Sequence, residues 1–415
     1  MAEHVVVVGA GIVGIACAHY LAESGYAVTV IDQGRIGGGC SHGNAGHICA
    51  SHVLPLNEPG NLRAALLSLV NPRAPFRVKP QWRQELLRWF WEFARRCNHR
   101  HALSAGRAMK SVLDASAREY EALFQAGGLD AGWQPLGLLY VLRTRRGMER
   151  FAAQDAMLRD AFGVGATRLE GSELVEFDQA LRPGLAGGFH YDGDAFLRPD
   201  ALTTNWARRL KERGVRFEED RRLLCVETGG GKVARLVTDA GEETADHYVF
   251  ALGAWSAELA ADLGCPIPVE PGKGYSITTD RPRNCPRHAL LFVEHRLAAT
   301  PFEDGFRLGS MMEFAGFDAT IPPRRIRQLV DSAKHYLDEP TGDRVLETWS
   351  GWRPMTWDSL PVIGRVPGLG NAVLATGHHM LGMTLAPATG RLVAEIIGER
   401  STRFDPAPFS PARFS

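Results

Sequence analysis

The sequence has no excess of charge of either sign: Lys and Arg together number 47, and Asp and Glu also number 47. Neutralising nucleic-acid phosphates needs a basic surplus, so this balance predicts no nucleic-acid partner. No stretch reaches the roughly 18–20 consecutive apolar residues of a membrane span. The N-terminus also lacks the basic and apolar regions of a secretory signal. We therefore expect a cytoplasmic protein.

Cysteine is scarce, with seven residues and no Cys-x-x-Cys pair. This argues against a disulfide framework and against a zinc site, so we predict no bound metal. What the chain does have is 45% apolar residues, 45 glycines and 24 prolines in 415 residues. That composition is typical of a compact globular protein. The length is too great for one ordinary core and suits two domains.

The N-terminal segment predicts a dinucleotide site. A buried strand, Val5–Val8, is followed by three spaced glycines, Gly9, Gly11 and Gly14, the last of which lies in a helix over about 12–24. A second strand, Ala27–Ile31, then ends at the acidic residue Asp32. Gly9 permits a tight turn, Gly11 lets the backbone approach a pyrophosphate, and Gly14 lets the helix pack closely on the strand. Asp32 stands where a carboxylate accepts from ribose hydroxyls, which favours FAD or NAD over NADP. A tight strand–helix turn without a ligand is the alternative.

Two glycine-rich segments favour FAD over NAD. The loop over 37–47 follows Asp32 directly and is too rich in glycine for regular structure. Near the other end, a strand over Ala372–Ala375 leads through a glycine loop into a helix from about Thr384 to Ile397. A helix N-terminus there would stabilise negative charge on a reduced flavin. A further apolar strand within 246–256 should return the chain to the same sheet.

Several motifs together resemble the FAD-dependent D-amino-acid oxidase superfamily, which includes glycine oxidase and sarcosine oxidase, and within it the bacterial D-amino-acid dehydrogenases of the small-subunit type. They are VVVVGAGIVG, Ser41-x-x-Asn44-Ala45-Gly46, Leu252-Gly253, Gly272-Lys273-Gly274-Tyr275-Ser276, Gly351-x-Arg353-Pro354-Met355-Thr356-x-Asp358, Pro361-x-x-Gly364 and Thr376-Gly377-His378-x-x-Leu381-Gly382-x-Thr384. The resemblance runs from residue 5 to about residue 398. It implies non-covalent FAD and flavin-dependent oxidation of a D-amino acid to a 2-oxo acid and ammonia.

The resemblance also implies a set of site residues. The cofactor would be bound by Gly9, Gly11, Gly14, Asp32, Ser41, Asn44, Ala45, Gly46, Val226, Gly253, Gly377, Gly382, Met383 and Thr384. Arg353 would bind the substrate carboxylate bidentately, with Tyr275 donating its hydroxyl to the same group. His47 and His379 are further candidate catalytic residues that could tune the substrate or the flavin. Structural roles are the alternatives: Arg353 paired with Asp358 across a turn, Tyr275 half-buried in a strand, and each histidine orienting a loop.

Three departures from the family pattern leave the substrate open: His47, the pair His379-Met380, and Pro301 after Thr300. One alternative substrate is a secondary amine such as D-proline, cis-4-hydroxy-D-proline or a sarcosine-like compound. Another alternative is a non-catalytic flavin-binding subunit of a larger complex.

The expected fold is α/β, with a discontinuous Rossmann-like FAD domain and a smaller mixed-sheet (α+β) substrate domain. The FAD domain would comprise 1–53, 196–265 and 355–415, and the substrate domain 54–195 and 266–354. The segment 351–364 carries Pro, Asp and Gly residues that predict turns, beginning at Arg353-Pro354.

The segment 81–97 predicts a helix with tryptophans and arginines on most sides. Such a helix could touch a membrane surface or a partner subunit, which would make a quinone or a membrane electron-transfer chain the electron acceptor and place the protein on the inner face of the membrane. Packing between the domains, with arginine stems covering apolar surface, is the alternative.

Overall fold

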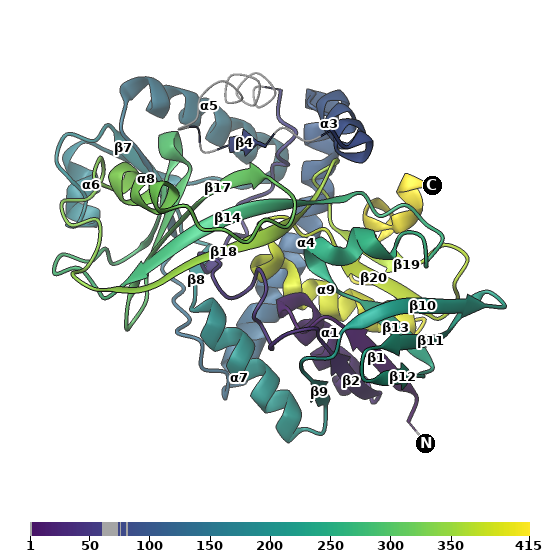
Figure 1. Ribbon diagram of the computed structural model, residues 1–415. Coiled ribbons are helices and arrows are strands. Elements are labelled where there is room, and N and C mark those ends of the chain that lie inside the picture. Colours follow the sequence, from purple (N-terminus) through teal and green to yellow (C-terminus); the bar gives the residue numbers. More distant parts are fainter. Residues whose placement is uncertain (1, 60–73, 75, 80–81) are drawn as a thin grey trace.

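The computed structural model describes residues 2–59, 74, 76–79 and 82–415. A six-stranded sheet lies near the N-terminus (Figure 1), in the order β19-β20-β13-β1-β2-β9. These strands are β19 (Val362–Arg365), β20 (Ala372–Thr376), β13 (His247–Phe250), β1 (His4–Val8), β2 (Ala27–Ile31) and β9 (Arg216–Glu218). All neighbours pair in parallel except β19 and β20. Parallel sheets are covered on both faces, which explains the unbroken valine run of β1.

Three helices accompany this sheet: α1 (Ile12–Glu23), α7 (Pro199–Glu212) and α9 (Gly382–Ile397). α1 and α9 pack closely because Gly390 has no side chain; a Cβ there would lie 2.4 Å from the carbonyl oxygen of Ala16. The long helix α4 (His99–Gln125) packs on α9. A small antiparallel sheet, β10 (Leu223–Gly229), β11 (Lys232–Thr238) and β12 (Gly241–Glu243), flanks the assembly.

A nine-stranded mixed sheet makes up the other half (Figure 1). Its order is β18-β14-β17-β16-β15-β5-β7-β6, with β4 also paired to β17: β18 (Val345–Thr356), β14 (Val269–Thr279), β17 (Phe306–Phe314), β16 (Leu297–Pro301), β15 (Ala289–Phe292), β5 (Leu138–Leu142), β7 (Gly187–Tyr191), β6 (Thr167–Glu170) and β4 (Phe76–Val78). Its helices are α3 (Gln84–Arg95), α5 (Arg145–Phe162), α6 (Ser172–Phe177) and α8 (Pro323–Ala333).

Short elements complete the chain. They are the pair β3 (His47–Ile48) and β8 (Ala195–Phe196), and the 3₁₀ turns η1 (Gly253–Leu259), η2 (Val293–His295), η3 (Ala407–Phe409) and η4 (Pro411–Phe414). β3 follows the glycine-rich loop directly. It therefore connects that loop to the segment leading into α7.

The expected fold class is confirmed: a Rossmann-like parallel sheet is joined to a mixed sheet with its own helices. The domain boundaries at 53, 195, 265 and 354 stay a prediction. The predicted return of the chain near 246–256 is confirmed, because β13 pairs with β1.

The turn predicted at Arg353-Pro354 is wrong, because both residues lie inside the twelve-residue strand β18. β18 is the edge strand of its sheet. Proline is tolerated at an edge, where its missing N–H breaks no ladder. Pro354 stands opposite Pro271 of β14, and neither proline has an N–H group to donate to the other strand.

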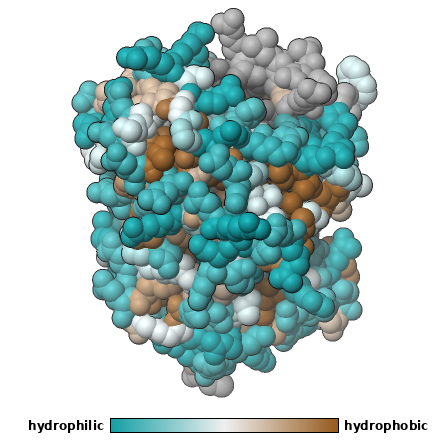
Figure 2. All heavy atoms as spheres, turned by 90° about the vertical axis from the view of Figure 1, so that its left-hand side faces the viewer, coloured by the Kyte–Doolittle hydropathy of each residue, from teal (hydrophilic) through white to brown (hydrophobic). Residues whose placement is uncertain are grey.

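The surface over α6 and α8 is largely hydrophilic, with apolar residues in separate patches (Figure 2). Among the described residues, no helix has both the length and the apolar character needed to cross a membrane.

Candidate active site

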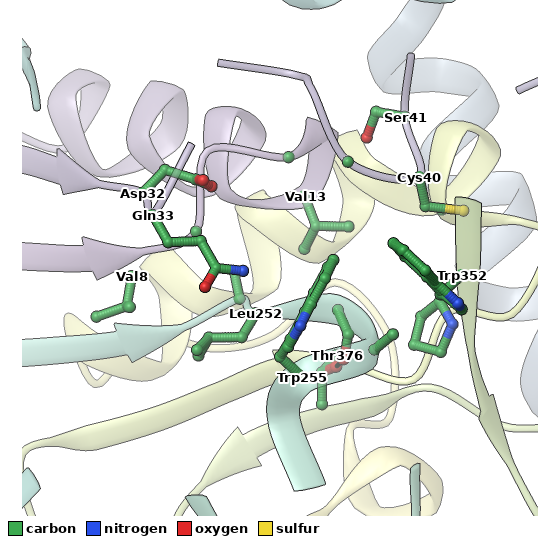
Figure 3. Close-up of a pocket in the computed structure, with 18 of the residues that line it drawn as sticks. Val8, Val13, Asp32, Gln33, Cys40, Ser41, Leu252, Trp255, Trp352 and Thr376 are labelled. Atoms are coloured by element: carbon green, nitrogen blue, oxygen red, sulfur yellow. Dashed lines mark hydrogen bonds between the residues drawn. The ribbon is translucent and has the colours of Figure 1, made fainter. Parts of the chain in front are cut away.

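An elongated cavity of about 560 Å³ lies where the parallel sheet meets β18. Asp32 and Gln33 lie at one end of it, Cys40 and Trp352 at the other, and the rings of Trp255 and Trp352 project into it (Figure 3). Its wall includes the ends of β1, β2, β13 and β20, the glycine-rich loop, and the first residues of α1 and α9. These segments are far apart in the sequence and meet at the carboxyl ends of the parallel strands, where α/β proteins bind ligands.

At one end of the cavity, Asp32 presents a carboxylate whose position is fixed by the backbone. Its Oδ2 accepts from the Ala10 amide at 2.7 Å and its Oδ1 from the Gly34 amide at 2.8 Å. Burial raises the pKa of Asp32 above its usual value, although both amide bonds oppose that shift. Each oxygen keeps a further lone pair, so this group can accept from ribose hydroxyls.

The N-terminus of α1 opens onto the middle of the cavity. Its N-cap residue is Gly11, which has no side chain to cap the helix. Ser41 Oγ instead accepts from the Ile12 amide at 3.0 Å. A Cβ on Gly11 would meet only Ser41 Oγ at 3.6 Å, so the backbone is open to a ligand. In contrast, a Cβ on Gly14 would lie 1.8 Å from the Gly9 carbonyl oxygen. Gly14 therefore allows the helix to pack closely on the strand, which is the role predicted for it. It does not line the cavity.

The loop before α9 brings a buried histidine to the same cavity. The Thr356 amide donates to His379 Nε2 at 3.0 Å, so Nε2 is an acceptor and Nδ1 carries the proton. Nδ1 is buried and has no hydrogen-bond partner among the described residues. Burial lowers the pKa of His379 to about 4, so the ring is neutral at physiological pH. It is a neutral donor in the wall of the cavity.

Two other histidines are neutral for the same reason. Burial lowers the pKa of His378 to about 3 and that of His47 to about 4. His378 Nε2 lies 2.9 Å from Thr389 Oγ1, and His47 Nε2 lies 2.9 Å from Thr300 Oγ1. His378 lines the cavity, whereas His47 stands behind the glycine-rich loop.

Arg353 lies in β18 between Trp352 and Pro354, both of which line the cavity. Its Nη1 donates to the Met311 carbonyl at 2.6 Å. No carboxylate of the described residues lies within ion-pair distance of it; Asp358, the alternative partner expected from the sequence, is bound by Arg413 at 2.7 Å instead. A Cβ on Gly274 would lie 2.3 Å from the guanidinium. Gly274 therefore provides the space that Arg353 occupies.

Tyr275 lies on the opposite face of its strand from Gly274. Its hydroxyl donates to Glu313 Oε2 at 2.8 Å, and its ring packs in the apolar cluster that includes Leu329 of α8. Burial and this bond raise its pKa. The structure thus places Tyr275 and Arg353 on opposite faces of the sheet, and neither is among the residues that line the cavity.

The structure brings more than half of the predicted cofactor residues to the cavity wall. Those that line it are Gly9, Gly11, Asp32, Ser41, Asn44, Gly253, Gly382 and Met383, with His379 of the catalytic candidates; those that do not are Gly14, Ala45, Gly46, Val226, Gly377 and Thr384. Val226 is buried, and its amide donates to Asp262 at 2.8 Å. Thr384 Oγ1 accepts from the Cys49 amide and donates to the His47 carbonyl, which ties α9 to the glycine-rich loop.

Several lining residues were missed by the sequence analysis: Gln33, Arg221, Arg222, Trp255, Glu258 and Trp352. Trp255 follows the end of β13 by five residues, and Trp352 precedes Arg353 directly. Their positions next to predicted site segments could have identified both as candidates. Arg221 and Arg222 follow β9 without any motif.

The cavity fits a flavin dinucleotide. It offers a ribose acceptor at Asp32, a helix N-terminus at Gly11 and a second at Gly382. Both helix N-termini favour an electron-rich ligand. The site thus has one place for a pyrophosphate and a separate one for the acceptor-bearing edge of a flavin.

Comparison with known proteins agrees with this geometry. The profile of the family described as FAD dependent oxidoreductase (DAO) matches residues 4–396. A D-amino acid dehydrogenase from Vibrio vulnificus is 34% identical over 410 residues, covering 95% of this chain and 96% of the relative. One from Neisseria meningitidis is 30% identical over 416 residues, covering 99% of both chains. The solved glycine oxidase from Geobacillus kaustophilus superposes with a TM-score of 0.78 at 24% identity, covering 99% of both chains. The chain belongs to this family of FAD-dependent oxidoreductases.

Proposed function

We propose that the protein oxidises D-amino acids to 2-oxo acids and ammonia, with Arg353 binding the substrate carboxylate. The observation that carries this is a half-buried guanidinium with no carboxylate partner among the described residues, on the residue between two that line the cavity, Trp352 and Pro354. A cation in that state favours an anionic ligand, and a guanidinium binds a carboxylate bidentately. The D-amino acid dehydrogenases matched over nearly the whole chain support the substrate class.

The chemistry needs little from the protein beyond binding and orientation. FAD held in this cavity would supply the acceptor for the hydride of the substrate Cα. Arg353 fixes the carboxylate, and the neutral histidines keep the cavity free of additional positive charge that would oppose an imine cation. The substrate amine must be neutral before the hydride leaves, and water then hydrolyses the imine to the 2-oxo acid and ammonia.

Replacing Arg353 tests this assignment. In Arg353→Leu, the KM for D-alanine should rise by about 10- to 100-fold, because charge-assisted hydrogen bonds contribute about 1.5–3 kcal/mol. The flavin content and visible spectrum should stay unchanged, as should binding of an amine that lacks a carboxylate. An unchanged KM for D-alanine would remove Arg353 from the site.

We also propose that FAD is held without a covalent bond. Burial raises the pKa of the Cys40 thiol, so the nucleophilic thiolate is scarce. His42, the other nearby candidate, is engaged by Glu347 at 2.7 Å. Acid precipitation should leave the yellow flavin in the supernatant; colour in the pellet would contradict this.

We further propose that α3 docks on an anionic membrane surface, which makes a membrane quinone the electron acceptor. Trp91, on the exposed side of the helix, is 58% exposed, and the Arg95 guanidinium lies 4.5 Å from the centre of its ring. Trp82, two residues before the helix, is 99% exposed, and Arg88 is exposed as well. Aromatic rings beside arginines suit a lipid interface. Trp89, in contrast, is buried and donates to the Pro268 and Met355 carbonyls, so it anchors the helix to the protein. Residue 81, at the start of the predicted helix, lies outside the described residues.

Vesicle co-sedimentation tests this surface. The double variant Trp82→Ser and Trp91→Ser should lose most of its binding to vesicles that contain phosphatidylglycerol, with its FAD retained. Val345→Ser, which removes an apolar residue of β18 that is 57% exposed, close to the value for Trp91, is the control and should bind like the wild type. Equal sedimentation of all three proteins would rule out α3 as the docking surface.

A further inference from the structure

The glycine-rich loop that borders the cavity is held from behind by two side chains of the mixed sheet. Thr300 Oγ1 donates to the Ala45 carbonyl at 2.6 Å. Arg307 Nη1 donates to the carbonyls of His42 and Asn44, at 3.0 and 2.9 Å. Thr300 and Arg307 are directly paired across β16 and β17. This one cross-strand pair therefore donates hydrogen bonds to three carbonyl groups within residues 42–45 of the loop.

Arg307 is itself rigidly placed. It is only 1% exposed, and its Nε donates to Thr278 Oγ1 of the neighbouring strand at 2.9 Å. Its Nη2 lies 3.5 Å from Glu347 Oε2, and Glu347 Oε1 lies 2.7 Å from His42 Nε2. Glu347 thus contacts both the arginine and the loop residue that the arginine binds. A buried arginine is costly unless it is paired and hydrogen-bonded in this way.

The direction of these bonds determines which way the other backbone groups of the loop point. The C=O and N–H groups of a peptide unit point in opposite directions. Because the carbonyls of His42 and Asn44 point to Arg307, the amides of Gly43 and Ala45 point away from it. Neither amide has an acceptor among the described residues. Asn44, between them, lines the cavity.

We propose that Arg307 and Thr300, supported by Glu347, are positioning residues that hold the loop at Asn44, where it lines the cavity, and that turn the backbone amides of Gly43 and Ala45 away from the mixed sheet, toward the flavin side. The mixed sheet thereby determines how the loop of the parallel-sheet half presents its N–H donors. These donors would favour the more electron-rich, reduced flavin. This role concerns FAD binding and the flavin potential alone. It can therefore be tested independently of the proposed substrate.

The test uses the FAD-loaded protein without substrate. In Arg307→Lys and in Thr300→Val, the FAD dissociation constant should rise about tenfold. The preference for reduced over oxidised flavin should also weaken about tenfold, which lowers the two-electron midpoint potential by about 30 mV. Flavin fluorescence during dilution reports the first quantity, and equilibration with a redox dye reports the second.

Arg325→Lys is the matched control. Arg325 is also a buried arginine of the mixed-sheet half, at 2% exposure, but it binds the Ala74 carbonyl and Gln328 and does not contact the loop. It should lower the melting temperature without changing FAD affinity or potential. If Arg307→Lys fails to fold, Thr300→Val, which is nearly isosteric, decides the outcome. A Thr300→Val protein with wild-type affinity and wild-type potential would overturn the assignment.

Discussion

Asp194 shows how one buried carboxylate supports the loop that reaches the cavity. Its Oδ1 accepts from the Ser51 amide at 2.9 Å and its Oδ2 from the Ser51 hydroxyl at 2.6 Å. Ser51 follows β3, so these bonds anchor the chain just after the glycine-rich loop. Asp194 is 2% exposed and has no ion-pair partner among the described residues. Burial raises its pKa to about 7.

The raised pKa predicts that Asp194 costs stability as the pH rises. Protons bind Asp194 more tightly in the folded than in the unfolded chain, so its contribution is lost as the pH rises from its ordinary pKa of 3.8 to about 7. The stability advantage of Asp194→Asn over the wild type should therefore grow by on the order of 2–3 kcal/mol between pH 5 and pH 8.5. Urea unfolding at both pH values measures this difference. The exposed Asp160→Asn should show no such pH dependence; the same behaviour in Asp194→Asn would contradict the account.

At the scale of single residues, the sequence predicted the cofactor positions better than the catalytic ones. Asp32 and Gly11 follow from local strand and helix signals, and both line the cavity. Arg353 and Tyr275 lie on neighbouring strands, so their relation depends on which face of the sheet each side chain occupies. Pairing of β14 with β18 places Gly272 opposite Arg353, which leaves Tyr275 on the other face. That register is a long-range property that no local motif encodes.

At the scale of elements, the close approach of α1 to β1 is the most demanding contact of the cofactor site. A Cβ on Gly14 would lie 1.8 Å from the Gly9 carbonyl oxygen, so Gly14→Ala must push the helix away from the strand. We expect an FAD dissociation constant at least tenfold higher and a lower melting temperature. Gly193→Ala is the control, because nothing lies within 4 Å of a Cβ there. Full FAD binding by Gly14→Ala would contradict the proposed packing.

The elements that the sequence predicted well are those with local signals. The bounds of β2 agree with the sequence prediction, and α1 and α9 begin or end within about two residues of it. β18 was missed as a strand because it contains Pro354, and its edge position is visible only once the sheet is assembled.

At the scale of the whole molecule, several buried neutral histidines predict acid sensitivity. Burial lowers the pKa values of His19, His47 and His379 to about 4, and that of His378 to about 3. The unfolded chain binds these protons more tightly, so stability is lost as pH falls below about 6.5. These four histidines outweigh the opposite effect of Asp194, so stability should rise with pH up to about 7 and change little above it.

Unfolding free energies measured between pH 7 and pH 5 test this expectation. They should fall by several kcal/mol for the wild type, since each histidine contributes on the order of 2–3 kcal/mol. His378→Gln, which keeps a hydrogen-bonding group near Thr389, should show a shallower decline. A free energy of unfolding that stays constant down to pH 5 would contradict the burial of these rings in a neutral state.

The most direct test of the proposed function is an anaerobic titration of the FAD-loaded protein with D-alanine, L-alanine, D-proline, cis-4-hydroxy-D-proline and sarcosine. The visible absorption of the flavin reports its reduction. If the protein oxidises D-amino acids, D-alanine should bleach the flavin, L-alanine should not, and Arg353→Leu should need far more D-alanine. Bleaching by the secondary amines alone, or by none of the compounds, would contradict the proposed function.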